Sequence, residues 1–226
     1  MTTISITDEG GPAKRYHHGD LRRALLTAAT AVLERCGPEA LSLRAVAREA
    51  GVSPAAPYHH FKDKDELILA VAREGFQQLK AAIAERRASV EPGSERSSDL
   101  GLAYIKFALT HPALYRVMYD CARRTDAFPD DGAQSESSFQ SIRRAAAAMG
   151  GPQVSETDVY LAAIAGWCLA HGLAEMRGFA QFKALKEQLG GEEAFLRGVL
   201  EHVGMFRNLD PAASLATRPS PSPKGS

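Results

Sequence analysis

Apolar residues recur at helical spacing along almost the whole chain, and this periodicity constrains the fold more than any other feature. Leu21, Leu25, Ala28 and Val32 form the first such stripe, and similar stripes follow it. We find no alternating apolar and polar run bounded by turn pairs, which is the pattern of a half-buried strand. The sequence therefore predicts an all-α fold.

Turn and capping residues divide this pattern into helices. Asp20, Ser42 and Asp63 are capping residues that precede apolar stripes, and glycine or proline follows the first two stripes. The expected helices are 20–36, 42–50, 53–61, 63–88, 95–109, 112–122, 133–148, 155–177 and 192–208, with a weaker piece at 181–188. The expected domains are a disordered arm 1–14, a helix-turn-helix domain 15–62, a connecting helix 63–91, a bundle 92–209 and a disordered tail 210–226.

Composition limits the kind of protein. The 226 residues are 45% hydrophobic, and 27 Lys and Arg balance 27 Asp and Glu, so the chain is neither disordered nor uniformly basic. The three cysteines lie far apart and form no disulfide framework, which fits a reducing compartment. The longest apolar run, 159–170, is shorter than the ~20 residues of a membrane span. We therefore expect a cytoplasmic protein with no membrane partner.

The segment Leu43–Phe61 is the most informative part of the chain. Two short helices joined at Gly51 form a helix-turn-helix, because glycine supplies the positive φ of the sharp turn. Ala47 allows the helices to approach closely, and Val46, Val52 and Phe61 are placed to fill the core between them. Such a unit sets its second helix in the major groove of DNA. The alternative is a plain helical hairpin within a bundle.

Charge around this segment favours DNA. The segment from Lys14 to Lys64 contains nine Lys or Arg residues and only five Asp or Glu, and it holds four of the seven histidines. A locally basic module in a neutral chain is the pattern expected for phosphate binding. The alternative is an ordinary solvated surface.

At this point the chain resembles the TetR family of bacterial transcriptional regulators. The resemblance rests on three blocks in the right order, YHHGDLRRALLTAA, SLRAVAREAGVS and PYHHFKDKDELILAV, within residues 16–75. In the second half, GWCLAHGLAEM and HPALYRVMY resemble the WHG-type ligand-binding domain of some members. The resemblance implies a dimeric, ligand-responsive regulator, most often a repressor, that binds a double-stranded DNA operator.

The resemblance also implies the DNA contacts. His18 and Gly19 would lie where the first helix meets the backbone, and Lys64 would pair with a phosphate. The remaining implied contacts are Ser42, Arg44, Ser53, Pro54, Ala55, Tyr58, His59 and His60.

Pro57 departs from the family pattern. Proline removes an amide hydrogen and pushes Ala56 away from helical angles, so the first turn of the recognition helix should be distorted or 3₁₀. Pro54, Ala55 and Ala56 can meet thymine methyl groups but cannot hydrogen-bond a base. Sequence recognition must then depend on Arg44, Tyr58, His59 and operator shape, with the basic arm Lys14-Arg15 as a further candidate in a minor groove.

The helices after Pro92 are implied to bind a ligand and to dimerise. This half holds many large groups, among them Tyr119 and Phe128, which suit a small apolar or aromatic effector. The candidate ligand residues are Tyr104, Phe107, Tyr115, Met118, Phe139, Trp167 and His171. The alternative is that these side chains pack the bundle, and His171 could be a core histidine.

Helices 155–177 and 192–208 form the expected dimer face. Small residues would make the first helix smooth, and large apolar residues recur on the second: Ala162, Ala163, Ala165, Gly166 and Ala170, then Phe195, Leu196, Val199, Val203 and Phe206. We expect no cofactor and no metal, because no ligand cluster has metal spacing. No catalytic motif indicates an enzyme. A ligand carrier that has lost DNA binding is the remaining rival.

Overall fold

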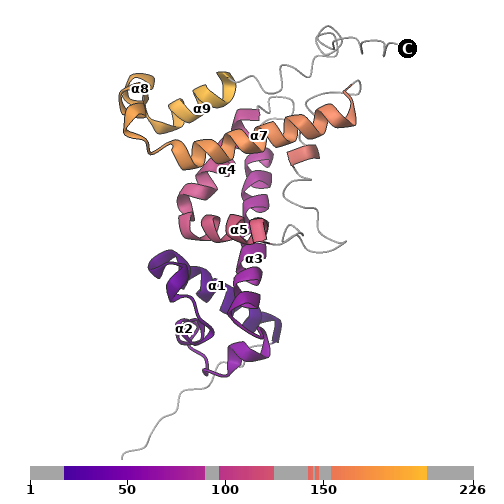
Figure 1. Ribbon diagram of the computed structural model, residues 1–226, viewed down its shortest axis with the longest axis vertical. Helices are drawn as coiled ribbons and strands as arrows, with labels where there is room; N and C mark the ends of the chain where they lie inside the picture. Colours follow the sequence, from indigo (N-terminus) through magenta and orange to yellow (C-terminus); the bar gives the residue numbers. More distant parts are fainter. Residues whose placement is uncertain (1–17, 90–96, 125–141, 145, 148–153, 203–226) are drawn as a thin grey trace, which may run out of the picture. The chain divides into compact units, whose positions relative to one another are not determined.

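The computed structural model describes residues 18–89, 97–124, 142–144, 146–147 and 154–202, and every regular element within these ranges is a helix (Figure 1). The all-α prediction is therefore confirmed. The chain divides into two units, residues 1–67 and 68–226. The expected arm 1–14 and tail 210–226, and the break at Pro92, lie outside the described residues.

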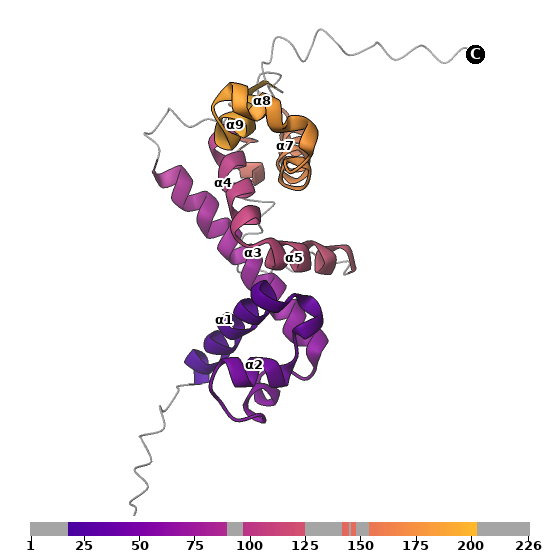
Figure 2. The same ribbon diagram turned by 90° about the vertical axis from the view of Figure 1, so that its left-hand side faces the viewer.

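The first unit packs a long helix against two short elements (Figure 2). Helix α1 (His18–Cys36) ends at Gly37, whose φ of 79° needs no Cβ penalty, and a 3₁₀ turn (Pro38–Ala40) follows. Helix α2 (Leu43–Glu49) packs on α1. Gly51 has the expected positive φ of 67°. Val46, Ala47 and Phe61 are buried as predicted, whereas Val52 is only half-buried.

The expected helix 53–61, the recognition element, is not an α-helix. It contains no α-helix, only a turn followed by a 3₁₀ segment, Ala56–His59. The Tyr58 amide donates to Ala55, and the His60 amide donates to Pro57, both to a residue three back. Pro57 has no amide hydrogen and is buried, so the α pattern is interrupted at this position. The predicted distortion is confirmed, and the 3₁₀ segment covers only Ala56–His59.

One helix continues from the first unit into the second. Helix α3 (Lys64–Ala88) begins within the first unit, where Asp63 Oδ1 accepts from the Glu66 amide at 2.9 Å. The second unit then adds α4 (Ser97–Thr110) and α5 (Pro112–Arg124). Residues 142–144 and 146–147 are also helical, within the expected helix 133–148.

The last elements are α7 (Glu156–Met176), a 3₁₀ turn (Ala180–Phe182), α8 (Lys183–Leu189) and α9 (Glu192–His202). Helix α4 packs against both α7 and α9, and α8 packs against α9 (Figure 2). Ser155 caps α7 by accepting from the Asp158 amide at 3.1 Å.

The predicted dimer face is wrong in part. Five of its residues are buried within the chain and cannot form an outer face: Ala162, Ala163, Ala170, Phe195 and Leu196. Ala162 and Ala163 form a buried cluster with Ala146 and Val159, and α7 and α9 both pack against α4. Ala165 is exposed, while Gly166 and Val199 are half-buried. Val203 and Phe206 lie outside the described residues.

Candidate nucleic-acid interface and effector site

The start of α2 presents one structural serine and one exposed arginine. Ser42 Oγ accepts from the Ala45 amide at 3.1 Å, so this side chain caps the helix. Arg44 is exposed, two residues further along. The Ser42 hydroxyl therefore already caps α2, and a contact with DNA would use the same hydroxyl. The Arg44 side chain is exposed and can reach outward.

The recognition element exposes most of the residues expected to meet DNA. Ser53, Pro54, Ala55 and His59 are exposed, and 53% of the Tyr58 surface is accessible. His60 is half-buried beside Phe61, with ring centroids 6.4 Å apart. The exposed surface offers one phenol and one imidazole but few other polar groups.

Three further predicted contacts lie near helix starts. The exposed Lys64 begins α3, and its Nζ donates to the Pro38 carbonyl at 3.4 Å. Because this hydrogen bond is long, a phosphate could replace the carbonyl as the partner of Nζ. His18 and Gly19 begin α1, and the structure gives no description of their side chains.

An ion pair ties α1 to α2. Both Arg35 guanidinium nitrogens donate to the Glu49 carboxylate, which lowers the pKa of Glu49 through these hydrogen bonds. Arg35 is therefore paired within the unit, while Arg44 is exposed.

The second unit holds a cluster of five aromatic side chains whose polar atoms meet around the Tyr104 hydroxyl. Tyr115 Oη lies 3.0 Å from it and Tyr119 Oη 2.6 Å from it. Trp167 Nε1 donates to Tyr104 at 3.2 Å and to Tyr119 at 3.1 Å. His171 Nδ1 lies 2.5 Å from Tyr115 Oη. Trp167 and His171 share a face of α7, as their spacing predicts.

Burial keeps this cluster uncharged. Tyr104, Tyr115 and Tyr119 are buried, and desolvation raises the pKa of each phenol. Desolvation also lowers the pKa of His171, with a further lowering from Arg123 and an opposing rise from Glu175. The cluster can therefore offer hydrogen bonds and aromatic faces, but no fixed charge.

The structure brings together Tyr104, Tyr115, Trp167 and His171 from the predicted ligand set. Phe107 is buried but packs on His111, with centroids 5.0 Å apart. Met118 is buried on α5, and Phe139 lies outside the described residues. The set missed Tyr119, which follows Tyr115 by one helical turn and could have been found by that spacing.

Helix α3 contacts this cluster directly, which the sequence did not reveal. The Phe76 ring meets the edge of Tyr119 with centroids 5.7 Å apart. A Cβ added at Gly75 would lie 2.6 Å from Met118 Sδ and 3.0 Å from Leu114 Cδ1. Glycine therefore permits α3 to lie close against α5, the helix that carries Tyr115 and Tyr119.

A second interhelical contact, made by ion pairs, lies near the other end of α3. The buried Asp99 accepts from Arg86 of α3 at 2.7 Å and from Arg197 of α9 at 3.1 Å. Since the arginines come from two helices, Asp99 joins α3 and α9 to α4.

In the part of the chain that the structure describes, no group of three or more His, Cys, Asp or Glu could hold a metal ion.

Comparisons with known proteins place this architecture. Residues 25–71 match the family described as bacterial regulatory proteins, tetR family, and residues 98–203 match a tetracyclin repressor-like C-terminal domain. The chain is 32% identical over 108 residues to the HTH-type transcriptional regulator BetI of Rhizobium meliloti (strain 1021). That alignment covers 46% of this chain and 53% of the relative, so it spans about half of BetI.

Solved structures agree over a greater length. A protein with unknown function from Rhodococcus sp. RHA1 is 32% identical, with a TM-score of 0.63, covering 87% of this chain and 98% of that one. The multidrug binding protein EbrR, complexed with imidazole, is 19% identical with a TM-score of 0.55, covering 80% of this chain and 93% of EbrR, and shows the fold alone.

These matches define a helix-turn-helix transcription regulator rather than an enzyme. The chain belongs to the TetR family, whose members are ligand-responsive, DNA-binding regulators of transcription.

Proposed function

We propose that the protein is a repressor that binds a pseudo-palindromic operator as a homodimer and is released by a small apolar or aromatic effector. The observation that carries the proposal is the contact between Phe76 of α3 and Tyr119 of the aromatic cluster. The same helix begins at Lys64, five residues after the recognition segment Ala56–His59, so α3 continues from the first unit into the second.

The DNA-binding surface would combine the starts of α1, α2 and α3 with the recognition element. Its members are the eleven residues expected from the family pattern: His18, Gly19, Ser42, Arg44, Ser53, Pro54, Ala55, Tyr58, His59, His60 and Lys64. Base recognition would depend on few of them, because Pro54 and Ala55 offer only apolar contacts. Arg44, Tyr58 and His59 supply the polar contacts, and operator shape supplies the rest.

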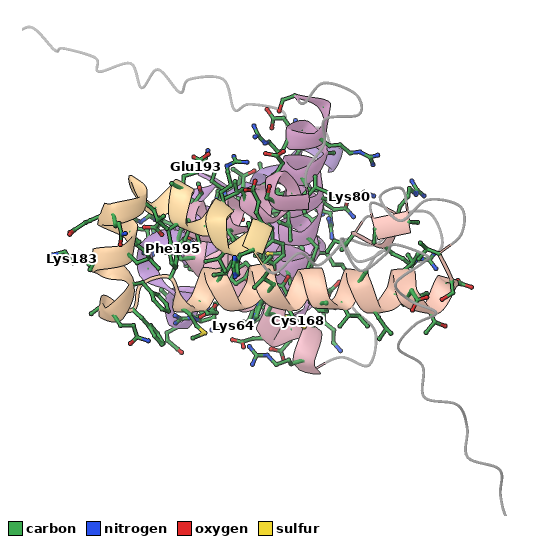
Figure 3. The ribbon with its side chains drawn as sticks, turned by 90° about the horizontal axis from the view of Figure 1, so that it is seen from above. Lys64, Lys80, Cys168, Lys183, Glu193 and Phe195 are labelled. Atoms are coloured by element: carbon green, nitrogen blue, oxygen red, sulfur yellow. The ribbon has the colours of Figure 1, made fainter. Side chains whose placement is uncertain are left out.

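An exposed apolar stripe on α7 supports the homodimer. Leu161, Ile164, Cys168 and Met176 recur at helical spacing, and Leu161 is 59% exposed (Cys168 is labelled in Figure 3). By length and composition alone α7 could cross a membrane, and only 17% of its most apolar 18-residue window is buried. We assign the stripe to a second copy, because a reader of two half-sites needs two recognition elements at fixed spacing.

The effector would act through α3. A ligand at Tyr104, Tyr115, Trp167 and His171 displaces Tyr119 or its neighbours, and Phe76 passes the change to α3. A ligand that fits better with α3 tilted selects dimers whose recognition elements are misspaced. Operator DNA must then weaken effector binding by the same factor, typically ~5–150-fold.

A linked titration tests this proposal. An aromatic effector is titrated with and without saturating upstream DNA of the protein's own gene, and fluorescence of Trp167, the only tryptophan, is followed. We expect weaker effector binding on DNA. Equal affinities would refute regulation by the ligand, and no binding of upstream DNA in a gel shift would favour the ligand carrier.

A variant of the contact residue separates coupling from folding. Phe76→Leu keeps an apolar side chain on α3 but removes the aromatic ring that contacts Tyr119. We expect operator affinity near that of the unmodified protein and a coupling factor closer to one. An unchanged coupling factor would show that the signal does not pass through this contact.

A further inference from the structure

The five polar groups of the aromatic cluster can all find hydrogen-bond partners only if His171 Nδ1 is an acceptor. Indole Nε1 is a donor only, and each phenol has a single proton to give. Three close contacts between the hydroxyls and His171 each need one proton: Tyr119 to Tyr104, Tyr104 to Tyr115, and Tyr115 to His171 Nδ1. Tyr104 Oη also lies 3.4 Å from His171 Nδ1, and this longer contact gives the phenols a second way to reach the same acceptor.

If His171 Nδ1 accepts, every proton finds a partner. Trp167 donates to Tyr119 or Tyr104, Tyr119 donates to Tyr104, Tyr104 to Tyr115, and Tyr115 to the imidazole. The chain then runs from α7 through α4 and α5 and returns to α7. It ends on a neutral histidine whose only ring proton is on Nε2.

If His171 Nδ1 donates instead, the chain reverses and one proton is stranded. Tyr115 must then donate to Tyr104, and Tyr104 to Tyr119. The Tyr119 proton faces Trp167 Nε1–H, which cannot accept, and no other acceptor contacts this hydroxyl among the described residues. Tyr119 is 8% exposed, so the stranded donor would cost the desolvation of a buried hydroxyl.

We propose that this hydroxyl chain fixes His171 as an Nε2–H donor, and that the effector is an uncharged aromatic compound carrying a carbonyl or similar oxygen acceptor. The inference rests on the proposed effector site and names the class of compound that the site takes. His171 is half-buried, so Nε2 can meet a ligand, and the rings of Tyr115 and Tyr119 flank it with centroids 5.5 and 4.7 Å away.

Charge near the donor gives a cation little advantage. Against the lowering by burial, Glu175 of α7 raises the pKa of His171, and Arg123 of α5 offsets part of this effect. A cation could use the aromatic faces, but it would have no acceptor for Nε2–H and would meet the positive end of that bond. A planar neutral acceptor satisfies both the rings and the donor.

Nitrogen NMR of the full-length protein tests the tautomer without any ligand. In ¹⁵N-histidine-labelled protein at pH 8, we expect His171, assigned by its loss in His171→Gln, as the Nε2–H tautomer. Tyr115→Phe removes the donor to Nδ1 and should give a mixture of tautomers, while Tyr160→Phe, which changes an exposed tyrosine, should not. An Nδ1–H tautomer in the unmodified protein would overturn the inference.

Three probes of similar size test the class of effector. Acetophenone carries the acceptor, α-methylstyrene replaces the oxygen by a methylene group, and phenyltrimethylammonium carries a positive charge. We expect acetophenone to bind about 3- to 10-fold more tightly than α-methylstyrene, the worth of one net hydrogen bond. Tyr115→Phe should reduce this ratio, and Tyr160→Phe should leave it unchanged.

The outcomes separate this inference from the proposed function. Equal binding of the first two probes, or tighter binding of phenyltrimethylammonium, overturns the class of effector while the site itself stands. Binding of none of the three at millimolar concentration overturns the proposed effector site, and the NMR measurement still decides the tautomer.

Discussion

The two units use polar side chains in opposite ways. In the first unit Arg44, Tyr58 and His59 are exposed, so they can bind a partner outside the chain. In the second unit Tyr104 and Tyr115 are buried and bonded to each other. An exposed site can be recognised from residue order along a motif, whereas a buried network depends on which helices come together.

Loss of dimerisation should give the largest effect on the exposed surfaces. In Leu161→Asp each protomer would bury an unpaired carboxylate at the proposed interface, which costs several kcal/mol. We expect monomers in sedimentation at micromolar concentration and operator affinity lower by about 100-fold or more.

The matched control changes an exposed leucine on another helix. Leu185 of α8 is 43% exposed and lies outside the α7 stripe, so Leu185→Asp should leave the dimer intact. A dimeric Leu161→Asp protein, or a monomeric Leu185→Asp protein, would move the interface to another surface.

Overpacking tests the contact between α3 and α5. In Gly75→Ala the new methyl group meets the buried Met118 and Leu114, and we expect the free energy of unfolding to fall by about 1–3 kcal/mol. Urea denaturation measures the change. Gly198→Ala is the control, because that helical glycine faces open space and alanine should stabilise α9 by up to about 1 kcal/mol. Equal stability of both variants would mean that α3 and α5 separate easily.

The sequence predicted the first unit well because its determinants are local. Gly51 had to adopt a positive φ wherever the chain turned, and Pro57 had to interrupt an α-helix. In the second unit helical periodicity gave the helices but not their facing sides. Ala162 and Phe195 were assigned outward for this reason, although both are buried: Ala162 packs with Ala146 and Val159, and Phe195 packs on Phe182. Tyr119 and Phe76 met only through tertiary packing.

Removal of one cation should give a smaller effect on DNA binding. Lys64→Ala should weaken binding to operator and to nonspecific DNA alike, because a phosphate contact carries no sequence information. We expect the slope of log affinity against log salt to fall by about one counterion. Arg35→Ala is the comparison, because it removes a cation that already pairs with Glu49 within the chain. It tests whether loss of such a paired cation changes the salt slope. An unchanged slope in Lys64→Ala would mean that, in the unmodified protein, Lys64 Nζ stays bonded to the Pro38 carbonyl on DNA and does not contact a phosphate.

The smallest expected effect is a pH dependence of stability that belongs to the buried network alone. Burial lowers the pKa of His171 below its ordinary value of 6.5, and of the charged groups near it Arg123 adds to this lowering while Glu175 opposes it. Between the two pKa values the unfolded chain binds more protons than the folded one. The contribution of His171 is therefore complete above pH 6.5 and is lost as the pH falls through the folded pKa.

Thermal unfolding between pH 5 and pH 8 measures this contribution as a difference between proteins. His171→Gln cannot titrate, so the stability difference from the unmodified protein should shrink as the pH falls below 6.5. His202→Gln, at the exposed end of α9, is the control for removal of a histidine. A difference that stays constant with pH would mean that His171 is not held neutral, and the contrast between an exposed and a buried polar site would then be weaker than the structure indicates.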